Sequence, residues 1–256
     1  MQISDQNARI SLSSEQAIPR VVYSTFRTKR LTRGHFNQIQ KFRDQNQGYS
    51  FVVLDNNDQH DYVSSKFKGE KILEIYERTT FGQMRTDIVR IALMLFEGGV
   101  YIDGTKRLTT PLSEVIPPTA RFVFAHERNI IPPEISIKTD ARILRNHRNT
   151  IVPWCMMSSS GFPVFKTMVE SIERDSALYE NVVFENPKTA ILKLTATYQY
   201  TTAVWRHLLN GIEDVHYAGI DFGEDYADVP IRESVGRKYK RHYSSASNKY
   251  ILKPRK

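Results

Sequence analysis

The chain has 256 residues, of which 40% are hydrophobic and 25% charged, and it carries a formal net charge of +8 at pH 7. This length allows one sizeable α/β domain with an ample core, or two small ones, and the composition is ordinary for a soluble globular protein. It contains no run of 18 apolar residues, so we expect no membrane span, and the single cysteine, Cys155, excludes an intramolecular disulfide. Because the N-terminus also lacks the apolar core of a signal peptide, we expect a cytoplasmic protein. The positive charge favours an anionic partner, such as nucleic acid, an anionic membrane surface or a phosphate-bearing ligand.

The N-terminal third alternates between strand-like and helix-like patterns. Residues 1–17 are polar and aperiodic, and we expect a flexible N-terminal arm there. The predicted elements that follow are a strand at 18–26, a helix at 31–46, a parallel strand at 49–54 and a helix at 63–78. Four Asp and Asn residues at 55–58 are expected to form a strand-to-helix turn and not a metal site, because such side chains bond their own backbone in turns.

The most informative stretch runs from Gly82 to Leu112. Apolar residues recur there at the spacing of one helical face, and Asp87 and Arg90 lie one turn apart on a neighbouring face. We expect the helix to end at Gly98 or Gly99, because glycine takes up the left-handed conformation that ends many helices without steric cost.

A short buried strand at residues 100–102 then delivers Asp103 at its carboxyl end. Ligands of open α/β sheets bind just beyond strand ends of this kind. A helix that carries an acid and a guanidinium, a glycine turn and a strand ending in an acid therefore predict one compact polar site.

The remaining chain continues the same alternation. The predicted elements are a strand at 121–126, a polar insertion at 129–149, an apolar strand at 151–160, a helix from 161 to 173 and a packed segment at 188–209. His126 ends the first of these strands, where it is either a structural histidine or a group facing a second substrate. The acidic loop at 221–225 is expected to be solvated, and basic residues gather from Arg232 to the C-terminus.

The central stretch resembles the DxD-containing glycosyltransferases with a GT-A fold, a family-32-like group. That group includes initiating mannosyltransferases of the yeast type, the glucosylating domains of large clostridial toxins and capsular-polysaccharide transferases. The matching residues are Asp87, Ile88, Arg90, Gly98, Gly99, Tyr101 and Asp103. In this chain the second acid of DxD is replaced by Thr105, which follows Gly104, as in the Asp-small-Thr of some capsule-type relatives.

The resemblance implies an α/β GT-A fold, a Rossmann-like domain with a mostly parallel central sheet flanked by helices. The resemblance extends in a less specific form from Ile18 to Ser244. We therefore expect one domain over residues 18–244 and a basic C-terminal tail over 245–256. Such a tail would also suit peripheral contact with an anionic membrane surface.

The resemblance further implies transfer of a sugar from a nucleotide-diphosphate sugar to a glycan or other hydroxyl acceptor, with retention of anomeric configuration. Asp87 and Arg90 would hold sugar hydroxyls, and with Asp103 they form the implied catalytic set. Tyr101 would pack beside the nucleoside or sugar. Phe26 stands where the family has an aromatic that stacks on the base, although it can equally be a core residue.

The same family chemistry implies a divalent cation, Mn²⁺ or Mg²⁺, because negative charge develops on the departing diphosphate. Asp103 is the implied metal carboxylate, and Thr105 offers a neutral hydroxyl in the place of a second acid. His242 resembles the family's closing histidine, which reaches the metal-bound diphosphate. It, or an acid of the loop at 221–225, would complete the metal shell.

Two alternatives remain open at this point. One is a catalytically weak relative that binds a nucleotide sugar or glycan, which the Asp-Gly-Thr at 103–105 suggests. The other is a nucleic-acid-binding protein, suggested by a pI near 9.5, although no signature of a common nucleic-acid-binding module is present and we expect no nucleic acid partner.

Overall fold

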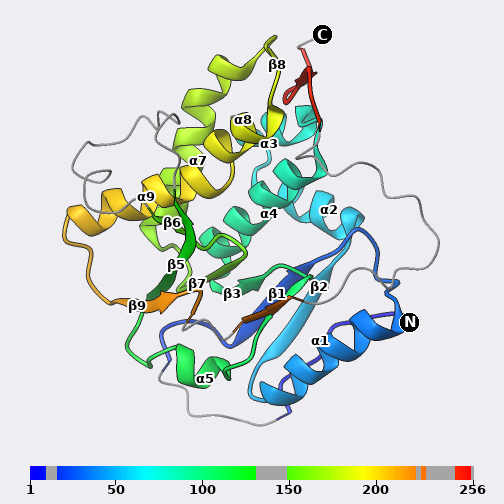
Figure 1. Ribbon diagram of the computed structural model, residues 1–256, viewed down its shortest axis with the longest axis vertical. Coiled ribbons are helices and arrows are strands. Elements are labelled where there is room, and N and C mark those ends of the chain that lie inside the picture. The colour runs from blue at the N-terminus through cyan, green and yellow to red at the C-terminus, as the bar shows by residue number, and fades with distance from the viewer. Residues whose placement is uncertain (10–15, 131–148, 223–225, 229–245, 255–256) are drawn as a thin grey trace.

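A computed structural model of the chain describes residues 1–9, 16–130, 149–222, 226–228 and 246–254. Within these ranges the chain builds three layers, with a twisted central sheet between two layers of helices (Figure 1). Apolar side chains fill the space on both sides of the sheet, so the chain has two buried clusters that share the sheet between them.

The central sheet of the described chain has seven strands in the order β2-β1-β3-β7-β5-β6, with β9 paired to β5. The strands are β1 (Val21–Thr25), β2 (Ser50–Leu54), β3 (Gly99–Ile102), β5 (Phe122–Ile130), β6 (Asn149–Ile151), β7 (Cys155–Ser158) and β9 (Val215–Ile220). Parallel pairing joins β1 to β2, β1 to β3 and β5 to β9, whereas β7 and β6 run antiparallel to their neighbours. Five of the seven strands therefore point in one direction, which confirms the predicted α/β class with a mostly parallel sheet flanked by helices.

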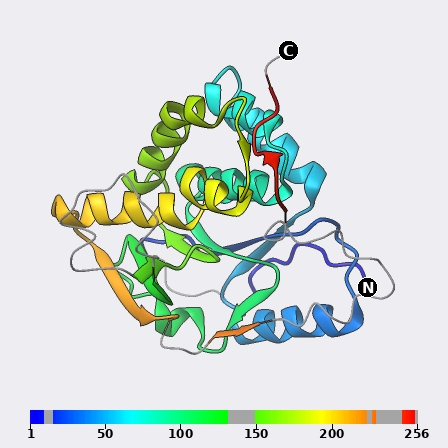
Figure 2. The same ribbon diagram turned by 45° about the horizontal axis from the view of Figure 1, so that its top comes forward.

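Helices cover both faces of this sheet (Figures 1 and 2). One face carries α2 (Asn56–Lys66), α3 (Lys71–Arg78), α4 (Gly82–Phe96), α7 (Pro163–Asp175), α8 (Pro187–Leu194) and α9 (Thr197–Leu209), and a short 3₁₀ turn follows α7 at Ser176–Tyr179. The other face carries α1 (Arg33–Gln45) and α5 (Leu112–Val115). Two small antiparallel pairs complete the described structure: β4 (Lys106–Leu108) with β10 (Tyr226–Asp228), and β8 (Val183–Phe184) with β11 (Lys249–Tyr250).

Helix α4 is the innermost helix, because it packs against β3 and β7 on one side and α2, α3 and α7 on the others. It ends as the sequence predicts. Gly98 has φ +69° and its N–H donates to the carbonyl of Leu93 over 3.0 Å, which is the left-handed glycine end of a helix. This ending turns the chain directly into β3.

Three predicted elements have different bounds in the structure. The single helix expected at 63–78 is two helices, α2 and α3, because the chain reverses at Gly69 with φ +82°. The strand expected at 121–126 continues as β5 to Ile130, and the apolar run at 151–160 contributes the end of β6 and then β7. The polar insertion expected at 129–149 lies mostly outside the described residues.

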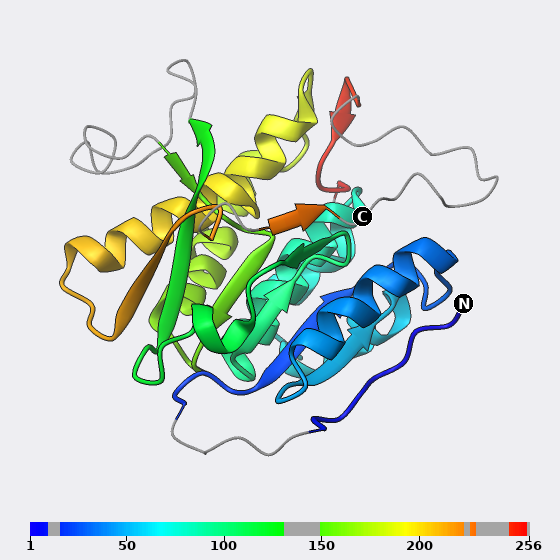
Figure 3. The same ribbon diagram turned by 60° about the horizontal axis from the view of Figure 1, so that its bottom comes forward.

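Both ends of the described chain pack against the domain, which for residues 1–9 differs from the expected flexible arm. Residue Ile3 is buried, and Gln6 pairs with Phe51 so that the N-terminal residues run beside β2 at the edge of the sheet (Figure 3). At the other end, Ile251 and Leu252 are buried in the cluster beneath α3. These apolar anchors are isolated in otherwise polar segments, so no periodic pattern reveals them.

Candidate functional site

Asp103 lies at the tip of β3, in a tight turn that leads into β4. The N–H of Asp103 donates to the carbonyl of Trp154 over 2.8 Å, and the N–H of Lys106 donates back to the carbonyl of Asp103 over 2.8 Å. These two bonds fix the backbone on both sides of the carboxylate. The side chain is 34% exposed, so one side of it remains open to a ligand.

The orientation of this carboxylate is set from inside the sheet. The hydroxyl of Tyr101 donates to Asp103 Oδ1 over 2.7 Å, and the hydroxyl of Thr25 lies 2.8 Å from the same tyrosine oxygen. Tyr101 is fully buried. In the structure Tyr101 therefore holds Asp103. Because its ring is not exposed, it does not have the expected position beside a nucleoside or sugar.

A buried ion pair lies behind Asp103. Arg90 donates to the Asp87 carboxylate and also to the carbonyl of Pro153 over 2.8 Å, and its Nη1 lies 4.0 Å from Asp103 Oδ1. The second oxygen of Asp87 accepts a 2.9 Å hydrogen bond from the hydroxyl of Thr195. The side chains of Asp87 and Arg90 are each only 7% exposed, so this is not the solvated surface pair that their spacing alone would allow.

The electrostatics of this cluster reflect its burial. Burial raises the pKa of Asp87, and the positive charge of Arg90 and the hydroxyl of Thr195 oppose that rise. Burial likewise raises the pKa of Asp103, against the opposing effects of Arg90, Tyr101 and Lys106. One guanidinium thus lies near two carboxylates and is the strongest of the groups that oppose the rise in their pKa values.

Phe26 follows β1 and packs against the Asp103 turn. A Cβ atom on Gly104 would lie 2.5 Å from the Phe26 ring, so only glycine lets the turn approach this closely. His35, near the start of α1, donates from Nε2 to the carbonyl of Gly104 over 2.6 Å, and its ring lies 5.7 Å from that of Phe26. The backbone of the turn is therefore clamped between an aromatic ring and an imidazole.

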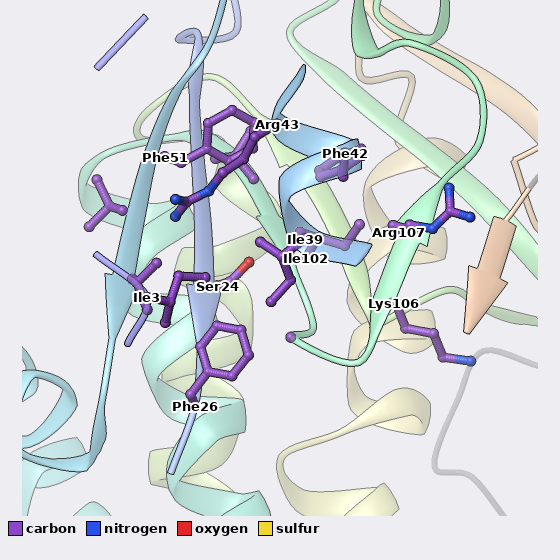
Figure 4. Close-up of a pocket in the computed structure, with 14 residues that line it drawn as sticks. Ile3, Ser24, Phe26, Ile39, Phe42, Arg43, Phe51, Ile102, Lys106 and Arg107 are labelled. Carbon is purple, nitrogen blue, oxygen red and sulfur yellow. The ribbon is translucent and has the colours of Figure 1, made fainter. Parts of the chain in front are cut away.

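A small cavity lies behind this clamp, under α1. Figure 4 shows Ile3, Ser24 and Phe26 on one side of it and Lys106 and Arg107 on the other. Its volume is about 20 Å³, which suffices for about one water molecule. A nucleobase cannot enter it, so a ligand that contacts Phe26 has to approach from the open side of the Asp103 turn.

We expect Gly104→Ala to destabilise the fold by about 1–3 kcal/mol, because the added methyl group overlaps the Phe26 ring. Thermal unfolding measures this loss. Gly82→Ala is the matched control, since a Cβ there meets nothing within 4 Å. The double variant Gly104→Ala/Phe26→Leu should recover most of the stability. A single variant as stable as the unchanged chain would contradict the packing described.

The residues around Asp103 fit a divalent cation that is shared with a phosphate-bearing ligand. Mg²⁺ in particular is usually held by one or two carboxylates together with substrate phosphates. Within the described residues, Asp103 Oδ2 has no hydrogen-bond partner, and Thr105 lies two residues further along the same turn. No group of three or more His, Cys, Asp and Glu side chains that could hold an ion alone occurs among the described residues.

The other residues that were expected to complete the metal shell are not found beside Asp103 among the described residues. His242 lies outside the described residues, as does most of the acidic loop at 221–225. Asp221 itself is buried and not solvated as expected, and its N–H donates to the carbonyl of His126 over 2.7 Å.

The structure thus brings together Asp87, Arg90, Tyr101 and Asp103, with Phe26 and Thr105 at the same turn. Three supporting residues, Thr25, His35 and Thr195, were not predicted as part of the site. Thr195 follows Asp87 by 108 residues, and no local spacing links the two. A single hydroxyl within the predicted packed segment at 188–209 is too common a feature to have revealed it.

None of the described helices is both long enough and apolar enough to cross a membrane.

Comparison with solved structures places the fold among those of glycosyltransferases. The structure of the PaToxG glycosyltransferase superposes with a TM-score of 0.54 at 12% identity, covering 75% of this chain and 71% of that one. The apo structure of the WbbM bifunctional glycosyltransferase aligns with a TM-score of 0.40 at 13% identity. The aligned region covers 81% of this chain and 40% of the WbbM chain. No curated protein sequence matches the chain.

The sequence model of the capsular polysaccharide synthesis protein family matches residues 30–174, which is more than half of the chain. The match contains the helix, glycine turn and strand that position Asp87, Arg90 and Asp103, and it agrees with the capsule-type resemblance of that stretch. The chain belongs to the capsular polysaccharide synthesis protein family.

Proposed function

We propose that the chain is a glycosyltransferase that moves a sugar from a nucleoside-diphosphate sugar to a hydroxyl group of a glycan acceptor. The observation that carries this proposal is the Asp103 carboxylate, which is held at a strand tip by Tyr101, backed by Arg90 and open on one side. Family membership and the shared fold support the general class of reaction.

The reaction breaks the bond between the anomeric carbon and the diphosphate, so negative charge develops on the leaving group. Mn²⁺ or Mg²⁺, when bound, acts as a Lewis acid on that diphosphate. Asp103 would hold the cation through its open carboxylate oxygen, and Thr105 would contribute a neutral hydroxyl. Lys106 begins β4 directly after this turn and adds positive charge near the same position.

The remaining residues orient the donor site. Tyr101 holds the Asp103 carboxylate in its orientation, and Arg90 opposes the rise in its pKa. Asp87 holds Arg90 in place, and Thr195 in turn donates to Asp87. Phe26 offers a ring beside the turn, where a flat nucleobase gains contact area at low entropic cost. Whether Asp87 and Arg90 also contact sugar hydroxyls, and whether anomeric configuration is retained, remain predictions from the family resemblance.

A second candidate function is binding of a nucleotide sugar or glycan without efficient transfer. Thr105 in place of a second acid favours it, because one carboxylate holds a divalent cation more weakly than two.

A donor screen tests the proposal. We expect uridine or guanosine diphosphate, together with Mn²⁺, to raise the melting temperature of the purified chain. We also expect a nucleotide sugar of one of these diphosphates to be hydrolysed slowly in water. Hydrolysis is read as release of nucleoside diphosphate, with EDTA as the control. Stabilisation without turnover for every donor would favour the second candidate. No stabilisation by any nucleoside diphosphate would contradict the proposal and would leave only glycan binding from the second candidate.

A further inference from the structure

A cluster of rings that is exposed at one end lies on β5, β9 and α9. We call it the aromatic platform and define it as Phe124, His126, Trp205 and Tyr217. His126 stacks on Trp205 with ring centroids 5.6 Å apart and lies 5.1 Å from the ring of Tyr217. Phe124 and Trp205 are buried beneath, whereas Tyr217 is 48% exposed. The platform therefore exposes mainly the ring of Tyr217, with His126 half-buried beside it on Phe124 and Trp205.

The platform lies at the same level of the sheet as the candidate donor site. Val100 on β3 and Val123 on β5 are both paired with Met157 of the intervening strand β7. Asp103 follows Val100 by three residues and His126 follows Val123 by three, on strands that run in the same direction. Two inter-strand spacings separate the two positions, which is on the order of 10 Å.

Both side chains also belong to the same face of the sheet. Successive residues of a strand point to opposite faces, so equal offsets from paired residues give the same face. Tyr101, which donates to Asp103, and Phe124, whose ring lies 5.9 Å from that of His126, are in one buried cluster. Helix α9 packs on this face over β6, where the N–H of Ile151 donates to the Thr201 hydroxyl over 2.9 Å. A ligand that contacts both Asp103 and the platform therefore has to run along the edge of α9.

The chemistry of the platform suits a sugar ring. A pyranose has flat C–H surfaces bordered by hydroxyl groups, and sites for such ligands combine aromatic area with a few polar groups. Here His126 Nδ1 lies 3.2 Å from the Tyr217 hydroxyl, and Glu127 beside them accepts a 2.8 Å hydrogen bond from Thr150. Tyrosine is enriched at binding interfaces because its ring supplies apolar area and its hydroxyl a polar tip.

We propose that the aromatic platform is an acceptor subsite, in which a pyranose ring of the acceptor glycan lies against Tyr217 and His126. In this position a hydroxyl of the acceptor faces the sugar that is bound at Asp103. The role as acceptor site rests on the proposed function, whereas sugar binding at the platform does not.

Saturation-transfer NMR with the methyl α-glycosides of glucose, galactose and mannose tests the platform. We expect at least one of them to receive magnetisation from the full chain. Tyr217→Ala should raise its Kd about three- to tenfold, since the variant loses one aromatic contact. Tyr217→Phe should bind nearly as the unchanged chain does, because the ring remains. Tyr250→Ala is the matched control, since that tyrosine is 39% exposed on β11 and should leave the Kd unchanged.

The outcomes separate this inference from the proposed function. If no glycoside binds, or if Tyr217→Ala and Tyr250→Ala have equal effects, the platform is not a sugar site. Binding of nucleoside diphosphate to the unchanged chain is measured in parallel. If that binding is absent while the Tyr217-dependent sugar binding remains, the transferase assignment fails and the sugar site stands.

Discussion

Asp103→Asn is expected to lower metal-dependent turnover by about a hundred- to a thousandfold, the range found when one group that stabilises transition-state charge is removed. The amide has the size of the carboxylate and its oxygen can still accept the hydrogen bond from Tyr101, so the fold should remain intact. What it lacks is the negative charge that a divalent cation requires. The release of nucleoside diphosphate from the best donor, measured at saturating Mn²⁺, gives the change in kcat.

Two further variants make this result specific to the site. Asp61→Asn is the matched control, because Asp61 is an exposed acid of α2, and it should leave turnover unchanged. Thr105→Asp restores the second acid of the family pattern and should lower the Mn²⁺ concentration needed for half-maximal activity. If Asp103→Asn retains full turnover, Asp103 is not part of the reacting site and the proposed function loses its main support.

The part of the site that is local in sequence could be predicted. The 3.6-residue periodicity of α4, its glycine end at Gly98 and the short apolar strand β3 are each determined by neighbouring residues. These elements place Asp87, Arg90 and Asp103 on a helix and the adjoining strand, so their closeness is expected from local sequence. The fold class follows from the same alternation of strands and helices.

The supporting residues could not be predicted, because they come from distant elements. Thr25 reaches Tyr101 across the β1–β3 pair, and Thr195 reaches Asp87 only after α8 packs against the helical layer. Burial of the ion pair is likewise a tertiary property, since a spacing of three residues is the same on an exposed helix. The docked N-terminus was missed for a similar reason, because Ile3 is a single apolar residue in a polar segment.

Arg90→Met is expected to destabilise the fold by about 3–5 kcal/mol, because it leaves the buried Asp87 carboxylate without its counterion. Methionine retains much of the side-chain volume, so the loss is mainly electrostatic. Chemical denaturation at pH 7 measures it. Arg206→Met, on the exposed face of α9, is the matched control and should change stability by no more than about 0.5 kcal/mol.

The pH dependence of this loss identifies its cause. Burial already raises the pKa of Asp87 in the folded chain, and removal of Arg90 raises it further. A carboxyl group whose pKa is higher in the folded than in the unfolded state binds more protons when folded, so its cost to stability grows as the pH rises above the unfolded pKa. The Arg90→Met variant should therefore regain stability relative to the unchanged chain as the pH is lowered from 7 toward 5. The double variant Asp87→Asn/Arg90→Met carries no buried charge at these positions, so it should be more stable than Arg90→Met at pH 7 and should lack the pH-dependent gain. A double variant as unstable as the single one would show that lost packing, and not an uncompensated charge, accounts for the effect.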